Sequence, residues 1–221
     1  MDIPKNKTIL FFSPHCDDEI ISAGALLTSL SKHNNVIVCY FNNSPKGVVG
    51  NLSELEKIKI RQREANEACK ILGVKAQFLN LDKQLKQENQ KLIITLIKNI
   101  INKTQPSLII TIYEYDAYPT HKKVTQLVKK SLSDTKIPLW FGEVWTPISK
   151  PNDVFYFNDE LMSIKLKALS CYNSQNRRTD WKEAIKGLNR YRAISLREQF
   201  DGFGSANLLK GKYAEVFFKN N

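Results

Sequence analysis

Runs of consecutive apolar residues alternate along the chain with segments in which apolar residues recur every three or four positions. The runs are typical of buried strands, and the spaced pattern is typical of helices that cover a sheet. Their alternation predicts an α/β fold with three layers, in which a mostly parallel sheet carries helices on both faces. The predicted strands are Thr8–Phe12, Asn35–Tyr40, Gln77–Leu81, Ser107–Ile112, Asp153–Phe157 and a last one near Ala214–Phe218. The predicted helices are one with Ile20, Ala23, Leu27 and Leu30 on its apolar stripe, one over Leu52–Leu72, one over Glu88–Lys103, one that begins near His121, one over Asp159–Tyr172, and a basic one within Arg177–Arg197.

A length of 221 residues is enough for one α/β core, and we expect a single domain over residues 1–221. The composition, with 42% hydrophobic and 25% charged residues, is that of an ordinary soluble protein. No apolar run approaches the roughly 18 residues of a membrane span, and the first residues lack the cleavage site of a signal peptide. These features predict a cytoplasmic protein with no transmembrane segment.

The net charge of +11 is spread along the chain, and its densest segment is Arg177–Arg197. Such a segment can bind a phosphate-bearing substrate, an anionic membrane surface or nucleic acid, and a solvated helix face is the simpler alternative. The chain has no aromatic-rich nucleic-acid motif, so a nucleic acid is the least favoured partner. We expect a small-molecule partner, and a homo-oligomer stays open.

The cysteines lack C-x-x-C spacing, which favours reduced thiols over a disulfide framework or a zinc knuckle. Cys16 lies between His15 and Asp17, where a thiol is a conceivable soft ligand. A small residue that fills a tight turn is the favoured interpretation. The cysteines are Cys16, Cys39, Cys69 and Cys171.

Directly after the first predicted strand the chain carries His15, Asp17, Asp18 and Glu19. Adjacent carboxylates repel one another and lose hydration at the end of a buried strand, so a simple turn would gain nothing from them. A divalent cation removes this difficulty, and histidine with aspartate is ordinary ligand chemistry for zinc. The alternative is a helix N-terminus, whose positive dipole end the carboxylates complement, and both roles can hold together.

The chain has 3 histidines, of which His33 lies in a polar turn and His15 and His121 follow predicted strands. In an open α/β sheet, ligands bind beyond the carboxyl ends of the strands, where the strand order reverses. If the strands before His15 and His121 are neighbours there, both imidazoles and one aspartate can hold a catalytic zinc with an open position for water. The second aspartate can then act as general base, which indicates hydrolysis of an amide or ester. Ligand type does not separate zinc from other divalent metals.

Several motifs resemble, in order and over nearly the whole chain, those of the PIG-L/LmbE-like de-N-acetylases. These are zinc enzymes that remove acetyl groups from N-acetylglucosamine-type sugars. The matching segments are PHCDDE at 14–19, RQREA at 61–65, LGV at 72–74, Asp82, YPTH at 118–121, SQ at 174–175 and YAEVF at 213–217.

The resemblance implies a Rossmann-like fold with the active site at the carboxyl ends of the strands. It implies that zinc is bound by His15, Asp18 and His121, that Asp17 is the general base acting on metal-bound water, and that Arg61 and Asp82 shape the substrate side. It makes Glu19 a supporting carboxylate. The implied reaction releases acetate from an N-acetylated amino sugar or its conjugate.

Three positions depart from the family pattern. Tyr118 replaces a histidine that helps to polarise the substrate carbonyl or to protonate the amine, and a phenol is a weaker acid than an imidazolium. Thr120 replaces an aspartate, so it can orient a neighbour but adds no charge. Cys16 replaces a proline. Because no ligand is lost, metal binding is expected to survive, and an alternative function is that of a metal-binding but catalytically impaired sugar-binding protein.

Overall fold

The computed structural model describes residues 4–86, 89–202, 204 and 211–220. Within these residues, all strands belong to one 7-stranded sheet with the order β3-β2-β1-β4-β5-β7-β6. β1 to β5 are parallel, whereas β7 is antiparallel to both of its neighbours. The mostly parallel α/β sheet is therefore confirmed. The strands are β1 (Thr8–Ser13), β2 (Asn35–Tyr40), β3 (Lys75–Phe78), β4 (Leu108–Ile112), β5 (Leu139–Gly142), β6 (Asp153–Phe157) and β7 (Tyr213–Asn220).

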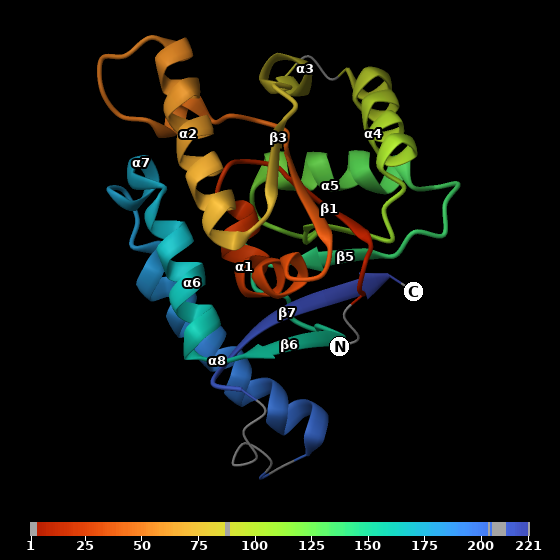
Figure 1. Ribbon diagram of the computed structural model, residues 1–221, viewed down its shortest axis with the longest axis vertical. Coiled ribbons are helices and arrows are strands. Elements are labelled where there is room, and N and C mark those ends of the chain that lie inside the picture. Colours follow the sequence, from red (N-terminus) through yellow and green to blue (C-terminus); the bar gives the residue numbers. More distant parts are fainter. Residues whose placement is uncertain (1–3, 87–88, 203, 205–210, 221) are drawn as a thin grey trace.

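Helices cover both faces of the sheet (Figure 1). Successive residues of β1 serve opposite faces: Ile9 and Phe11 pack with α1, α2 and α6, whereas Leu10 and Phe12 pack with α4 and α5. This alternation follows from the two-residue period of a strand and produces the predicted three layers. The helices are α1 (Asp18–Ser31), the 3-10 helix η1 (Pro45–Gly47), α2 (Glu54–Leu72), α3 (Asp82–Lys86), α4 (Gln90–Thr104), α5 (Pro119–Ser131), α6 (Asp159–Ser170), α7 (Asn173–Asn176) and α8 (Trp181–Asp201).

The strand order reverses between β1 and β4, which lie side by side with Ile9 opposite Leu108 and Phe11 opposite Ile110. From β1 the chain proceeds outward through β2 and β3, then returns to the other side of β1 as β4. The segments that follow β1 and β4 therefore emerge next to each other at the switch point of the sheet. The strands before His15 and His121 are therefore neighbours, as the predicted convergence of the two histidines requires.

Several predicted boundaries are corrected by local chemistry. α2 begins at Glu54 and not at Leu52, because Ser53 and Glu56 form a reciprocal capping box. β3 ends at Phe78, three residues early, and Asn80 beyond it has a φ of +53° that interrupts an extended strand. α5 begins at Pro119, because the fixed φ of proline suits the first turn of a helix.

Other predicted helices differ at their ends. α6 ends at Ser170 rather than at Tyr172, and Glu88, the predicted start of α4, lies outside the described residues.

The basic helix is α8, and it is not only a solvated face: its Arg192 is buried and donates to both carboxylate oxygens of Glu143, at 3.1 and 2.6 Å. None of the described helices combines the length and apolarity that a membrane crossing needs.

An internal ion pair ties two helices of one layer, α1 and α6, to the sheet. α1 is kinked at Ala23, and the buried Glu215 of β7 accepts hydrogen bonds from the backbone N–H groups of Ala25 and Leu26 beyond the kink, at 2.9 and 2.8 Å. Lys165 of α6 donates to the same carboxylate at 2.6 Å, and burial lowers the pKa of this lysine despite the partner. The glutamate of the YAEVF segment thus fixes α1, the helix that begins at the site residues.

Candidate metal and active site

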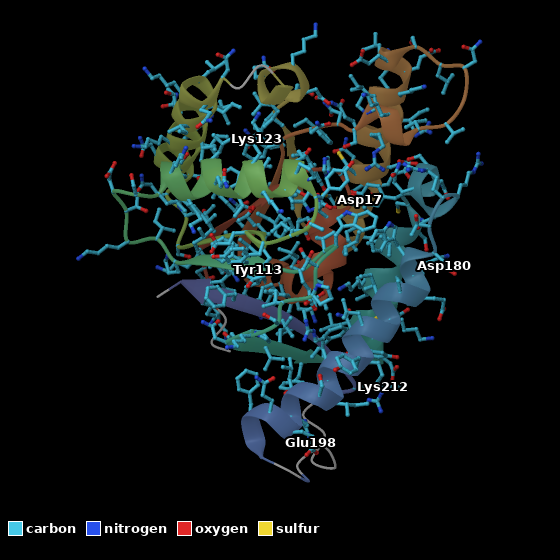
Figure 2. The ribbon with its side chains drawn as sticks, turned by 180° about the vertical axis from the view of Figure 1, so that it is seen from behind. Asp17, Tyr113, Lys123, Asp180, Glu198 and Lys212 are labelled. Atoms are coloured by element: carbon cyan, nitrogen blue, oxygen red, sulfur yellow. The ribbon has the colours of Figure 1, made fainter. Side chains whose placement is uncertain are left out.

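The turn after β1 is built to present side chains in different directions. Ser13 Oγ donates to the carbonyl of His15 at 2.7 Å, and the His15 N–H donates to Asp18 Oδ2 at 2.9 Å. Asp17 has a φ of +125°, a left-handed conformation that non-glycine residues rarely adopt and that is a form of strain found at functional sites. The two adjacent carboxylates consequently diverge, and Figure 2 shows Asp17 surrounded by other side chains near the start of α1.

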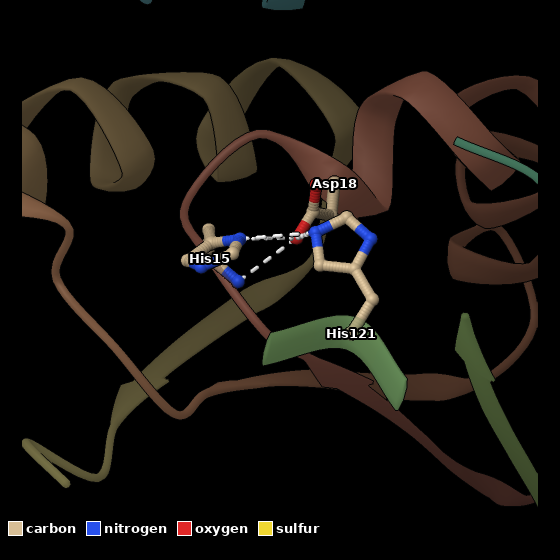
Figure 3. A group of neighbouring side chains, drawn as sticks. All are labelled: His15, Asp18 and His121. Carbon is tan, nitrogen blue, oxygen red and sulfur yellow. Dashed lines mark hydrogen bonds and ion pairs between the residues drawn. The ribbon is translucent and has the colours of Figure 1, made fainter. Parts of the chain in front are cut away.

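His15, Asp18 and His121 bring three donor atoms around one point (Figure 3). His15 Nδ1 lies 3.0 Å from His121 Nε2, and each of these nitrogens lies 3.2 Å from Asp18 Oδ2. Zinc bonds of about 2.05 Å in a tetrahedron separate the ligand atoms by roughly 3.3 Å, so the spacing suits one cation. Two imidazoles and a carboxylate at these distances therefore form a donor set that fits zinc or a similar divalent metal.

A buried carboxylate on the loop after β4 holds His121 from behind. Asp116 is fully buried, and its Oδ1 lies 3.1 Å from His121 Nδ1. A partner on Nδ1 orients the ring and leaves Nε2 free to face a cation. Sequence reasoning missed Asp116 and gave the orienting role to Thr120, but in the part of the chain that the structure describes it is Asp116 that meets this nitrogen. The available signal was a carboxylate five positions before the histidine, in the same segment after a buried strand.

Electrostatics within the cluster favour ionised ligands. Burial by itself disfavours the charge on Asp18, but contacts with His121 and His15 hold the pKa of its carboxyl well below its usual value. Burial likewise opposes a proton on His121, yet Asp18 and Asp116 raise the pKa of this imidazole to about 10. Without a metal the cluster thus keeps a proton on the histidine, and a bound cation would take over that positive charge.

Asp17 is held beside the cluster by Arg61 of α2. The guanidinium is almost fully buried, lies 3.3 Å from Asp17 Oδ2, and also donates to the carbonyl oxygen of Cys16. Burial raises the pKa of Asp17 to about 6, although Arg61 acts in the opposite direction. A carboxylate with a pKa close to neutral is suited to accept and return a proton near pH 7.

Arg61 is itself held by Glu64 and Ser174. Its Nη1 lies 3.5 Å from Glu64 Oε2, and Glu64 accepts hydrogen bonds from the Ser174 N–H and hydroxyl, both at 2.7 Å. The RQREA and SQ segments are therefore in contact, and they fix the guanidinium next to Asp17.

Glu19 lies beneath the turn and does not reach the donor cluster. Its Oε1 accepts hydrogen bonds from the hydroxyls of Tyr40 and Tyr172, each at 2.8 Å, and its Oε2 accepts one from the Asp17 N–H at 3.1 Å. Burial raises its pKa to about 7. Cys16 is also fully buried, and burial raises the pKa of its thiol, which favours the interpretation of a small residue in a tight turn.

A cavity of about 660 Å³ opens above the cluster. Asp82 lines it and accepts hydrogen bonds from the backbone and side chain of Asn43, at 3.2 and 2.9 Å. Tyr118 is about half exposed, and its ring centroid lies 5.4 Å from that of His15. Of the residues proposed from the sequence, those that line the cavity are His15, Asp17, Asp18, Arg61, Asp82, Tyr118 and Thr120. His121 and Glu19 are fully buried and are not lining residues.

Fold and site together are those of a Rossmann-like α/β protein with a His-Asp-His cluster at the switch point of its sheet. The PIG-L family, described as GlcNAc-PI de-N-acetylase, matches residues 10–132, which include β1, the donor cluster and α5. The chain belongs to the PIG-L family.

A curated relative, the probable N-acetyl-alpha-D-glucosaminyl L-malate deacetylase 2 of Bacillus cereus, is 31% identical over 136 residues. The match spans 57% of this chain and 60% of the relative's length.

Two solved structures share the fold. The N,N'-diacetylchitobiose deacetylase from Pyrococcus horikoshii has a TM-score of 0.78 at 21% identity, with 97% of this chain and 84% of that chain covered. GalB, the 4-carboxy-2-hydroxymuconate hydratase of Pseudomonas putida, has a TM-score of 0.80 at 18% identity, with 97% and 96% covered. Because a hydratase shares the architecture, the fold does not decide the reaction.

Proposed function

We propose that the chain is a metal-dependent hydrolase that removes the N-acetyl group from an N-acetylated amino sugar or its conjugate, with zinc as the resident cation. The observation that carries the proposal is the position of Asp17, a carboxylate with a raised pKa, beside the His15–Asp18–His121 cluster in the floor of an open cavity. Membership of the PIG-L family and the N-acetylglucosaminyl deacetylase relative support the sugar amide as substrate.

His15, Asp18 and His121 would hold the cation, which supplies Lewis-acid polarisation of the amide carbonyl and acidifies a water molecule. Asp17 takes a proton from the attacking water, whose oxygen forms the new bond to the acetyl carbon. Asp17 then returns this proton to the amine nitrogen as the C–N bond breaks, and acetate and a free amino sugar leave. Arg61 keeps the carboxylate of Asp17 in place during both transfers.

Tyr118 is proposed to donate a hydrogen bond from its hydroxyl to the oxyanion that forms on the former carbonyl. Its ring lies against both histidine rings of the cluster, at centroid distances of 5.4 and 5.3 Å. A donor of this kind stabilises the charge without transferring its proton, so the proton to the amine comes from Asp17.

The test measures acetate release from a panel of N-acetylglucosamine conjugates by the zinc-loaded protein and by Asp17→Asn. We expect the variant to lose roughly 10²- to 10⁴-fold in kcat, the size of a general-base contribution, while it still binds zinc. Asp134→Asn removes a carboxylate from the surface and is the matched control. Equal rates for the wild type and Asp17→Asn would refute the assignment of the base.

The replacement of the family histidine by Tyr118 favours one second candidate, a metal-binding sugar-binding protein without turnover. It differs from the first proposal in a measurable way. This candidate requires zinc and sugar affinity together with no acetate release from any member of the panel, and restoration of release by Tyr118→His.

A further inference from the structure

The loop after β5 carries a large aromatic side chain to the cavity. Trp145 lies in this loop, lines the cavity together with Tyr118, and is 50% exposed. It lies outside residues 10–132, the segment that the PIG-L family matches, so family membership assigns it no role. Aromatic side chains are common in the lining of ligand sites. The contacts of Trp145 indicate what it does in this one.

Reciprocal hydrogen bonds join the loop of Trp145 to the loop that carries Tyr118. Asp116 accepts hydrogen bonds from the N–H groups of Trp145 and Thr146, at 2.8 and 3.1 Å. In return, the Thr146 hydroxyl oxygen accepts one from the Ala117 N–H at 2.8 Å. Asp116 also accepts a hydrogen bond from the Tyr118 N–H at 2.9 Å. The backbones of Tyr118 and Trp145 are therefore fixed to the same carboxylate.

Helix α8 supports the loop of Trp145 from inside the protein. The buried Arg192 donates to both carboxylate oxygens of Glu143, at 3.1 and 2.6 Å, and to the Ile148 carbonyl at 2.8 Å. Glu143 also accepts a hydrogen bond from the Ile148 N–H at 2.7 Å. Because Glu143 and Ile148 lie on either side of Trp145 in the chain, these bonds hold both ends of the segment that presents the indole ring.

The indole ring stacks on the phenol of Tyr118. The ring centroids are 6.2 Å apart and the ring planes differ by 18°. Trp181, the first residue of α8, meets Trp145 edge-on at a centroid distance of 4.8 Å. Tyr118 also contacts the rings of His15 and His121, at 5.4 and 5.3 Å. Stacked and edge-on arrangements at such distances are those that aromatic pairs prefer.

Ring contacts alone set the direction of the Tyr118 hydroxyl. In the described part of the chain this hydroxyl forms no hydrogen bond, and the hydrogen bonds of Tyr118 involve only its backbone. Of the rings that contact Tyr118 among the described residues, the imidazoles of His15 and His121 belong to the metal cluster. Trp145 is therefore the contact that can hold the phenol without another task.

We propose that Trp145 is a positioning residue, whose ring keeps the Tyr118 hydroxyl in the direction from which it donates to the oxyanion. The inference rests on the proposed function, in which Tyr118 is that donor. A donor that is aimed before the reaction stabilises the developing charge without reorganisation, and a phenol that is free to turn loses part of this benefit. Trp181 supports Trp145 from the start of α8.

The first measurement is a double-mutant cycle on acetate release, with Trp145→Ala and Tyr118→Phe made singly and together. Trp145→Ala should lower kcat by about tenfold, less than the roughly 10²- to 10³-fold effect of deleting an oxyanion donor, because the hydroxyl remains but is aimed less often. In the Tyr118→Phe background the same replacement should leave kcat unchanged, because the hydroxyl that Trp145 aims is absent. Trp145→Phe keeps a flat ring and should restore most of kcat.

The second measurement does not depend on turnover. The protein is labelled with fluorotyrosine, and the fluorine NMR signal of Tyr118 is identified by its loss in Tyr118→Phe. We expect one narrow signal in the zinc-loaded wild type and in Trp145→Phe, and a broadened or split signal in Trp145→Ala, where the ring exchanges between rotamers. Tyr115→Ala is the matched control, because it removes an exposed ring from the same loop that does not line the cavity.

A narrow Tyr118 signal in Trp145→Ala would overturn the proposal, as would equal losses of kcat in the two Tyr118 backgrounds. A higher KM with unchanged kcat would also overturn it, because Trp145 would then bind the sugar instead of aiming the phenol. The outcome is separable from the proposed function. A wild type without acetate release refutes the hydrolase, and the NMR signal still tests whether Trp145 fixes the phenol. Acetate release with a narrow signal in Trp145→Ala refutes the positioning role and supports the hydrolase.

Discussion

Replacement of Asp116 by asparagine tests how the fold supports the metal cluster. Each oxygen of the carboxylate faces two nitrogens: Oδ1 accepts a hydrogen bond from the Tyr118 N–H at 2.9 Å and lies 3.1 Å from His121 Nδ1 as an ion-pair contact, and Oδ2 accepts from the N–H groups of Trp145 and Thr146 at 2.8 and 3.1 Å. An amide cannot replace this acceptor. If either carboxylate oxygen is replaced by the NH₂ group of asparagine, that group's N–H donors face the two nitrogens that the oxygen faced before.

The size of the effect follows from the two contacts that the amide nitrogen cannot accept, which are either two hydrogen bonds or one hydrogen bond and the ion-pair contact with His121. Hydrogen bonds to a charged acceptor contribute about 1.5–3 kcal/mol each, so the absence of two predicts a fall of about 3–6 kcal/mol in the free energy of unfolding. That is a large part of the usual stability of a domain, about 5–15 kcal/mol. Removal of the partner that orients a ligand histidine should also weaken zinc binding roughly 10- to 100-fold.

The assay combines denaturant unfolding with zinc competition against a chromophoric chelator, for the wild type, Asp116→Asn and the control Glu114→Gln. Glu114 lies two residues away and pairs with Lys129 near the surface, so its replacement should change the free energy of unfolding by no more than about 1 kcal/mol. If Asp116→Asn does not fold without metal, zinc-dependent refolding supplies the affinity instead. Stability and zinc affinity that match those of Glu114→Gln would refute the reasoning.

Three further measurements test other parts of the site and its support. Because Asp17 must be ionised to accept a proton and burial raises its pKa to about 6, kcat/KM should fall as the pH falls through about 6; a limb that persists unchanged in the residual activity of Asp17→Asn would contradict this. Glu215→Gln should lower the free energy of unfolding by about 3–5 kcal/mol, measured in denaturant, because it leaves Lys165 charged and buried without its partner; a change below about 1 kcal/mol would show the pair to be dispensable. Zinc at about 100 times its Kd should raise the free energy of unfolding by about 2.7 kcal/mol, and His121→Ala should abolish the increase; an equal increase in both proteins would place the metal elsewhere.

The boundaries predicted from the sequence agree with the structure where residues adjacent in the chain determine them. β2 and β6 begin and end where the apolar pattern predicts; a polar residue precedes each strand, and Asn158 follows β6. α2 and α5 shift because Ser53 and Pro119 set the first turns through capping chemistry, which acts over three or four residues and outweighs the apolar stripe.

Local order along the chain was also enough to nominate His15, Asp17 and Asp18 as site residues, since they follow one buried strand within a single turn, and to nominate His121 after another. Charge, ligand type and position after a strand are properties that a sequence contains. These properties indicate the chemistry and the candidate site residues, but they do not show that β1 and β4 are neighbours. Only that pairing places His121 next to His15 and Asp18.

Only the tertiary structure reveals the contacts that hold these candidates in place. Asp116 supports His121, Glu64 and Ser174 hold Arg61, and Glu215 anchors α1, through pairs as far apart as Ala25 and Glu215. The reason is physical: a hydrogen bond or an ion pair depends on distances of about 3 Å between atoms, and such distances are set by how strands and helices pack rather than by their order in the chain.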